Sequence, residues 1–320
     1  MSEVADLHAD SAAFLALIER PGAPPFHELP LETQRAASEK MMFAFRLPPP
    51  EVALAAGHVI ERAAAQGGPL RCRVYRPLGS DETQRLPALI WYHGGGCVVG
   101  NLESYDSLCR EISNRSGCAV VSCSYRLAPE HPFPAAVDDA WFALNWVVDH
   151  ARSLGIDEAR LAVGGDSAGG YLAIVAALTA RDAGGPPLRF QLLIYPGTDQ
   201  RRQTDSHRRY AKGYMLTETT MQYFIDAYLP PPADRNDWRA SPVLAPSVAG
   251  LPPALVITAS HDPIVDDCRA WAERLKAAGV PVRYSEYQGL IHGFFAMAKA
   301  FGAAQAAMEE ATAALREALV

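Results

Sequence analysis

Apolar runs of strand length alternate with helical patterns along most of this 320-residue chain, and this alternation limits the possible folds more than any other feature. The strand-like runs cover residues 71–75, 88–93, 119–124, 160–164, 190–195, 254–259 and 282–287. Helical spacing of apolar residues covers residues 105–116, 135–150, 168–182, 266–278 and 299–319. Strands and helices in alternation are typical of βαβ units, so the sequence predicts an α/β protein with a mostly parallel sheet.

Two long stretches interrupt the alternation. Residues 1–45 have helical apolar spacing and end in a cluster that contains Met41, Met42 and Phe43, just before three consecutive prolines. Residues 198–250 are polar and proline-rich, with one helical patch at 217–228. Long insertions in a compact α/β domain are often lids or binding segments. We therefore expect 1–45 and 198–250 to form a two-part cap, with surface decoration as the alternative. The main domain would then consist of residues 46–197 and 251–320.

Composition excludes several classes of protein. Hydrophobic residues make up 49% of the chain and charged residues 20%, which excludes intrinsic disorder and coiled coil. The formal net charge is −7 and the basic residues are scattered, so we expect no nucleic-acid partner. No window approaches 18 uninterrupted apolar residues, and the first residues are acidic, so we expect neither a membrane span nor an export signal.

The metal-ligating residue types are dispersed along the chain. The six cysteines have irregular spacings without a Cys-x-x-Cys motif, which fits neither a disulfide framework nor a zinc knuckle. The nine histidines include no His-Glu-x-x-His or comparable spacing. We therefore expect no metal, no cofactor and a cytoplasmic location.

The pentapeptide 165–169 matches Gly-x-Ser-x-Gly and lies between a strand-like run and an Ala-rich helical run. A sharp turn between strand and helix strains the backbone of the central Ser167. The residues two before and two after it must lack side chains, because the chain passes close to itself, and Gly165 and Gly169 meet that need. The turn would lift the Ser167 hydroxyl above the carboxyl edge of the sheet, so we expect Ser167 to be a nucleophile. A phosphate-binding loop is disfavoured, because the P-loop lysine and the GxGxxG spacing are absent.

Three consecutive glycines follow His93 at the end of a strand-like run. Glycines in this position let backbone N–H groups turn toward a ligand without obstruction by a Cβ atom. We expect the N–H groups of Gly95, Gly96 and Ala168 to bind the oxyanion of an acyl-transfer intermediate. His93 precedes the glycines, so we expect it to hold the loop rather than to catalyse.

A serine nucleophile needs a general base, and the base needs a carboxylate that fixes its tautomer. In α/β-hydrolases these residues follow the serine in the order acid, then histidine. Asp262 lies in the loop beyond the strand-like run 254–259, and His292 follows the next run. We therefore expect Asp262 to be the acid and His292 the base.

Other downstream residues are weaker candidates for these roles. His207 lies among arginines in the polar insertion, which favours a solvated surface position. His261 has only its own neighbours left to serve as an acid in the required order. Asp266 and Asp267 begin a helical pattern, so capping of that helix is the preferred interpretation.

Four segments together resemble the hormone-sensitive lipase-like family of α/β-hydrolase esterases, of the Gly-Asp-Ser-Ala-Gly type. They are residues 93–96, 165–169, 262–263 and 292–294. Segments 125–135 and 213–217 also resemble stretches characteristic of the family. The resemblance extends from about residue 70 to the end of the chain.

The resemblance implies an eight-stranded, mostly parallel sheet with a helical cap. It also implies a carboxylesterase that hydrolyses short acyl esters through the triad and an acyl-enzyme intermediate, with a small ester as the only partner of the active site. Some family members dimerise, so a homodimer is possible. Two rival functions are another hydrolase on the same scaffold and a non-catalytic receptor similar to the plant gibberellin receptors, which lack the histidine present here as His292.

Three further sets of residues carry expectations about the loop and the pocket. Arg126 and Glu130 are expected to form a buried ion pair or hydrogen-bond anchor beside the glycines. Cys97 departs from the family pattern and leaves the pocket shape open there. The apolar residues expected to line the substrate pocket are Phe43, Tyr195, Tyr214, Leu216, Ile291 and Phe294.

Overall fold

A single eight-stranded sheet forms the centre of the computed structural model, which describes all residues except 1–5, 20–21, 23 and 65–66. The strand order is β1-β2-β4-β3-β5-β6-β7-β8. Strand β2 pairs antiparallel with both β1 and β4, and all other pairs are parallel. The strands are β1 (Leu54–Ile60), β2 (Leu70–Arg76), β3 (Leu86–Tyr92), β4 (Ala119–Cys123), β5 (Ile156–Asp166), β6 (Leu188–Ile194), β7 (Ala254–His261) and β8 (Val282–Ile291).

The seven expected strands are confirmed, and β1 is the strand that the apolar pattern did not predict. β1 lies at the edge of the sheet and is mostly exposed, with a glycine and a histidine in its middle. An edge strand that buries little apolar surface needs no apolar run, so the sequence gives no signal for it. The central β3 must be apolar, because both of its faces are covered and residues 88–92 are fully buried.

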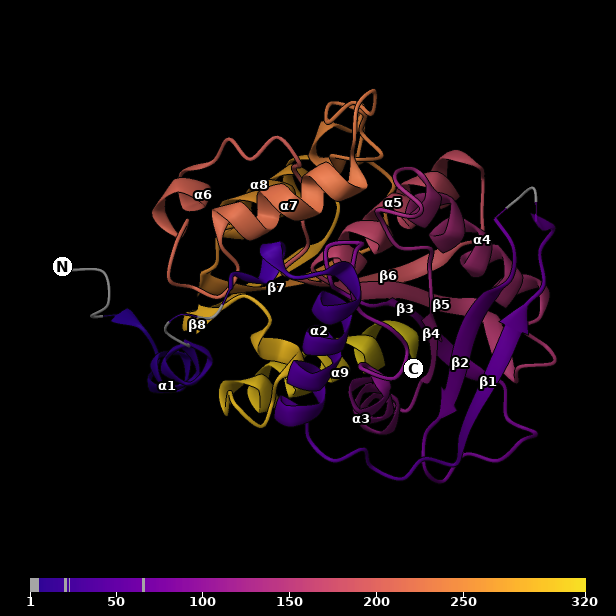
Figure 1. The fold of residues 1–320 in the computed structure, drawn as a ribbon. Coiled ribbons are helices and arrows are strands. Elements are labelled where there is room, and N and C mark those ends of the chain that lie inside the picture. Colours follow the sequence, from indigo (N-terminus) through magenta and orange to yellow (C-terminus); the bar gives the residue numbers. More distant parts are fainter. Residues whose placement is uncertain (1–5, 20–21, 23, 65–66) are drawn as a thin grey trace.

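Helices cover both faces of the sheet (Figure 1). Helix α3 packs against α9, and α4 packs against α5. The chain crosses from β3 to β4 in one direction and from β4 to β5 in the other, and right-handed crossovers in opposite directions place α3 and α4 on opposite faces. The five expected helices are confirmed, with unchanged ends in α5 and ends shifted by one to four residues in the others: α3 (Asp106–Ser116), α4 (Ala135–Asp149), α5 (Ala168–Asp182), α8 (Val265–Ala277) and α9 (Ala303–Leu319).

The two stretches that interrupt the alternation lie side by side beyond the carboxyl ends of the parallel strands (Figure 1). The first contains α1 (Ala9–Ile18) and α2 (Leu31–Phe45), and the second contains α6 (Asp205–Arg209) and α7 (Glu218–Tyr228). Phe26 of the first stretch contacts Phe224 of α7, with ring centroids 6.0 Å apart. Within the described part of the chain, every helix is too short or too polar to cross a bilayer.

Candidate active site

Ser167 stands at the turn between β5 and α5 with a backbone φ of 54° and ψ of −118°. Positive φ is unfavourable for a residue with a side chain, so the turn holds Ser167 in a strained conformation. A Cβ atom at Gly165 or Gly169 would overlap the Tyr92 carbonyl oxygen. The structure therefore explains both glycines by close approach of the chain to itself, as the sequence predicted.

Ser167, His292 and Asp262 form one chain of hydrogen bonds, although they come from three distant parts of the sequence. The Ser167 hydroxyl donates to Nε2 of His292 at 2.9 Å. Nδ1–H of His292 donates to Oδ2 of Asp262 at 2.6 Å. The other carboxylate oxygen, Oδ1, accepts from the backbone N–H of Ile264 at 3.0 Å. This arrangement fixes the tautomer of His292 and leaves Nε2 facing the serine.

Two adjacent parallel strands bring Asp262 and His292 together. Asp262 follows β7 directly, and β8 carries the chain to His292, with His261 and Ile291 paired in register after a bulge. Asp262 is fully buried and His292 is 7% exposed. Beneath the imidazole lies Tyr195, with ring centroids 4.6 Å apart. A buried floor of this kind restricts the imidazole to one orientation.

The glycine loop after β3 folds over the same site. Gly95 and Gly96 have φ values of 119° and 61°, which residues with side chains rarely adopt. Both glycines line the same cavity as Ser167 and Ala168. The structure thus brings together the three backbone groups that the sequence predicted as oxyanion donors.

His93 holds this loop, as predicted. Its Nδ1 lies 2.8 Å from the Gly94 carbonyl oxygen, and its ring stacks on Tyr125 at 4.4 Å. Burial lowers the pKa of His93 to about 4, so the side chain is neutral near pH 7. A neutral imidazole enclosed by rings and backbone supports the loop without a charge near the oxyanion.

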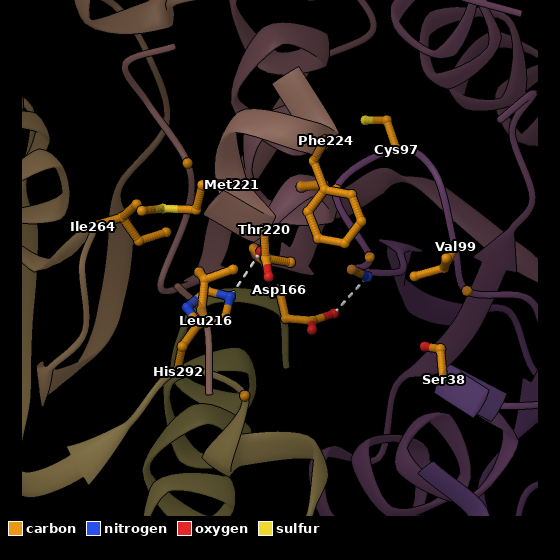
Figure 2. A pocket seen from close by; sticks show the side chains of 18 of the residues that line it. Ser38, Cys97, Val99, Asp166, Leu216, Thr220, Met221, Phe224, Ile264 and His292 are labelled. Carbon is orange, nitrogen blue, oxygen red and sulfur yellow. Dashed lines mark hydrogen bonds between the residues drawn. The ribbon is translucent and has the colours of Figure 1, made fainter. Parts of the chain in front are cut away.

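Asp166 is a site residue that the sequence analysis passed over. Its Oδ1 accepts from the Gly94 N–H at 2.9 Å (Figure 2). Its Oδ2 accepts from the Tyr105 hydroxyl at 2.8 Å. Burial raises the pKa of Asp166 to about 6, although the hydrogen bond from Tyr105 opposes the shift. The sequence did contain a signal for this role. Asp166 directly precedes Ser167 in the turn, and a residue at that position must lie next to the glycine loop.

Arg126 and Glu130 do not pair with each other, but both anchor the segment after β4, which is the second alternative expected for them. Arg126 binds the fully buried Asp139 at 2.7 Å, which anchors the loop to α4. Glu130 instead accepts two hydrogen bonds from Arg35 of α2, at 2.7 and 2.8 Å. Arg126 and Glu130 each find a partner on a helix, α4 or α2, whose position beside this segment the local sequence does not encode.

A cavity of about 470 Å³ opens above Ser167. Helix α2 contributes Ser38 and Met41 to its lining, and α7 contributes Met221 and Phe224 (Figure 2). The two interrupting stretches therefore enclose the space in front of the serine. Most of this lining is apolar, which suits a small organic group.

Of the six apolar residues expected to line the pocket, Leu216 does so. Phe43 is 44% exposed and its ring lies under the Arg46 guanidinium, because the helical period of α2 directs Met41 and Met42 inward instead. The expectation for Phe43 is therefore wrong.

The remaining four lie behind the cavity wall, so they were wrongly expected to face the substrate. Tyr195 and Phe294 contact each other beneath His292, with ring centroids 6.0 Å apart. Tyr214 packs against Tyr210, and Ile291 is fully buried at the end of β8. These side chains support the site from behind, a distinction that depends on packing and not on residue type.

Two further expectations need correction. His207 is buried, 5% exposed, and lines the cavity rather than the surface. Asp266 and Asp267 do lie in the first turn of α8, but Asp267 is also buried and faces the cavity. The polar composition of the insertion masked the burial of His207, because the short helix α6 turns this histidine toward the cavity while its neighbour Arg208 stays exposed.

Comparisons with known proteins agree with this geometry. A family model described as alpha/beta hydrolase fold matches residues 89–296. The carboxylesterase NlhH of Mycobacterium tuberculosis is 43% identical over 251 residues, which cover 77% of this chain and 78% of the relative. Ethyl acetate hydrolase of Pseudomonas putida is 38% identical over 302 residues, covering 91% and 92%.

Solved structures show the same architecture. An ester hydrolase from the metagenome of Lake Arreo has a TM-score of 0.92 and 45% identity, over 97% of this chain and 98% of the other. A thermostable esterase from Pseudomonas putida has a TM-score of 0.93 and 34% identity, over 99% and 98%. Both matches cover at least 97% of this chain, so the described parts of the two interrupting stretches belong to the shared fold.

Proposed function

We propose a carboxylesterase activity for this chain, because it belongs to the alpha/beta hydrolase fold family and its relatives include named esterases. The observation that carries the proposal is the hydrogen-bonded chain from Ser167 through His292 to Asp262, at 2.9 and 2.6 Å. A serine linked in this way to a histidine and a buried carboxylate can attack an acyl carbon.

In the first half of the reaction, the Ser167 oxygen attacks the ester carbonyl carbon while Nε2 of His292 takes the hydroxyl proton. Asp262 stabilises the imidazolium that forms. The N–H groups of Gly95, Gly96 and Ala168 bind the negative oxygen of the tetrahedral intermediate. His292 then returns the proton to the departing alkoxide oxygen, and an acyl-enzyme remains.

In the second half, His292 takes a proton from water, which attacks the acyl carbon of the acyl-enzyme. The same backbone donors bind the second oxyanion, and collapse of this intermediate releases the carboxylic acid and restores the Ser167 hydroxyl. Removal of one backbone donor typically costs about 3 kcal/mol of transition-state stabilisation. The strained elbow and the glycine loop hold these donors in place before the substrate arrives.

We also assign residues 1–45 and 198–250 to a cap over the site. Their described parts supply α2 and α7, whose side chains line the cavity. A mostly apolar cavity of about 470 Å³ accommodates a small ester, and the similarity to an ethyl acetate hydrolase favours short acyl chains. Rates for an acyl series from acetate to dodecanoate test this: we expect kcat/KM to peak at short chains and to fall steeply beyond them.

Ser167→Ala tests the proposed activity directly. We expect wild-type protein to release a burst of p-nitrophenol equal to the concentration of sites. The variant should lose at least about 10³-fold in kcat, because the nucleophile is missing. Ser153→Ala, which alters an exposed serine, is the matched control and should keep full activity. Normal turnover by Ser167→Ala would refute the assignment.

Two finer expectations stay proposals. The six cysteines are free and buried, which fits a reducing cytoplasm, and fractionation of the producing cells tests that location. A homodimer would have twice the monomer mass by light scattering after size exclusion, and a single monomer mass at micromolar concentration would contradict it.

A further inference from the structure

One wall of the cavity is polar, and the proposed ester hydrolysis uses none of its side chains. This wall contains Asp199, Arg202, His207 and Asp267, whereas most of the remaining lining is apolar. Asp199 is satisfied by Arg201, whose guanidinium donates to it at 2.7 and 2.8 Å. Arg202, His207 and Asp267 each have a buried side-chain atom that lacks a hydrogen-bond partner in the part of the chain that the structure describes.

Three buried atoms of this wall have no hydrogen-bond partner among the described residues: Nε of Arg202, Nε2 of His207 and Oδ2 of Asp267. The Asp267 side chain is 1% exposed and the His207 side chain 6% exposed. A buried polar atom without a partner costs about 1–3 kcal/mol, so native proteins rarely keep several together without a function. All three residues line the cavity, so a group bound there can supply the missing partners.

The geometry of His207 and Asp267 specifies what that ligand offers. Nε2 of His207 and Oδ2 of Asp267 lie 3.5 Å apart, too far for a good hydrogen bond between them. One oxygen atom placed beside both could lie at hydrogen-bond distance from each. Thr204 fixes the pair from behind, with its Oγ1 at 2.6 Å from Nδ1 of His207 and 3.4 Å from Oδ1 of Asp267.

The charges favour a neutral group over a cation. Burial raises the pKa of Asp267 well above its usual range and lowers the pKa of His207, so burial opposes a full charge on either side chain. The Arg202 guanidinium in the same wall would repel an ammonium group. A hydroxyl both donates and accepts, and can therefore satisfy one donor and one acceptor at once.

We propose that His207 and Asp267 form a subsite that binds a hydroxyl group on the ester substrate and so selects hydroxylated esters. The inference rests on the proposed esterase function and names its substrate class. The subsite and Ser167 line one cavity of about 470 Å³, so an ester bound at Ser167 shares this space with the subsite. The hydroxyl can belong to the acyl group or to the leaving alcohol, and the two arms of the test separate these sources.

The test compares esters that differ only in a hydroxyl and a methyl group. In the acyl arm, ethyl 2- and 3-hydroxybutanoate are compared with ethyl 2- and 3-methylbutanoate. In the alcohol arm, 2-hydroxyethyl butanoate is compared with propyl butanoate. We expect at least one hydroxylated ester to exceed its counterpart by about tenfold or more in kcat/KM, because unsatisfied polar groups reject the apolar analogue.

Two variants connect that preference to the subsite. His207→Phe keeps an aromatic ring, and Asp267→Leu keeps a similar volume, so each removes hydrogen bonding while filling the wall. Either substitution should bring the hydroxyl-to-methyl ratio close to one. Arg208→Ala, an exposed neighbour on α6, is the control and should keep the wild-type ratio.

The possible failures are distinguishable. Wild-type ratios below about twofold in both arms, with plain esters hydrolysed, would overturn the subsite and leave the esterase proposal standing. A preference that survives both variants would also overturn it, and so would faster turnover of ethyl 3-aminobutanoate than of the hydroxylated ester. Absence of turnover with every ester would overturn the proposed function itself. The wild-type comparison needs no variant, so a folding failure cannot leave the question open.

Discussion

Backbone strain is concentrated at the proposed site. Within the described residues, five that are not glycine have positive φ: Cys97, Ser167, Tyr195, Arg202 and Met215. Tyr195 contacts the imidazole of His292, and the other four line the cavity. Such conformations cost about 1–3 kcal/mol each, and they persist only where the surrounding structure enforces them. Because these strained residues cluster around one cavity, they support a functional role for this part of the backbone.

The acid of the proposed triad has a sharp test in Asp262→Asn. The amide keeps the shape of the carboxylate, but it cannot stabilise the imidazolium and favours the wrong histidine tautomer. We expect kcat to fall by about 10⁴-fold at neutral pH, with little change in thermal stability. Asp205→Asn, at an exposed acid, is the control. A loss of less than tenfold in Asp262→Asn would argue for another acid.

Asp166 should make stability depend on pH. Its folded pKa, about 6, lies above the ordinary value of 3.8, so the folded protein holds this proton more tightly than the unfolded chain. The stabilising contribution is therefore complete below about pH 4 and lost as pH rises through 6, by up to about 3 kcal/mol. Asp166→Asn does not titrate and should lack this decline.

Urea unfolding at pH 4.5, 5.5 and 6.5 measures the effect of Asp166. As pH rises, we expect the unfolding free energy of the wild type to fall relative to that of Asp166→Asn. Parallel curves across this range would show that the pKa of Asp166 is not raised in the folded protein.

At the level of elements, the attachment of α2 to the main domain depends on an ion pair. Arg35 binds Glu130 through both guanidinium branches, and it also donates to the backbone carbonyls of Val98 and Ala128. Because α2 lines the cavity, this contact links the N-terminal stretch to the loop that follows the glycines. Partly exposed pairs contribute only about 0–1 kcal/mol, so the link positions the helix more than it stabilises the fold.

A double-mutant cycle tests this link. Glu130→Gln and Arg35→Met should each lower kcat/KM by a few-fold through a higher KM, and the double variant should be little worse than either. The melting temperature should change by only a few degrees. The exposed pair of Arg85 and Glu158, remote from the cavity, is the control cycle and should leave KM unaltered. Additive effects of Glu130→Gln and Arg35→Met would show that the two side chains act independently.

For the molecule as a whole, stability depends on the centre of the sheet. Ile90 is fully buried in β3, which pairs with β4 and β5. Ile90→Ala should lower the unfolding free energy by about 2–5 kcal/mol, because it removes buried apolar surface and leaves a cavity. Val59 lies on the edge strand β1 and is 54% exposed, so Val59→Ala should lower the unfolding free energy by less than about 0.5 kcal/mol. Equal losses of unfolding free energy in the two variants, measured by urea titration, would contradict this prediction.

The contrast between buried and exposed elements also explains which elements could be predicted from the sequence. Buried strands and amphipathic helices must carry apolar residues at fixed spacing, so all seven strands with that spacing were found. β1 and the short α6 bury few apolar side chains and were missed. The residues of the proposed triad and the glycine loop could be predicted because the proposed chemistry requires particular residue types at strand ends.

Local constraints were therefore decided by the sequence alone: the elbow at Ser167, the glycines that its turn requires, and the order of acid and base. The tertiary structure decided which side chains share a space, because contacts between distant segments have no local signature. It turned His207 and Asp267 toward one cavity, moved Tyr195 behind the imidazole, and gave Glu130 a partner on α2. Covalent neighbours determine backbone shape, whereas packing of the whole chain determines the surroundings of each side chain.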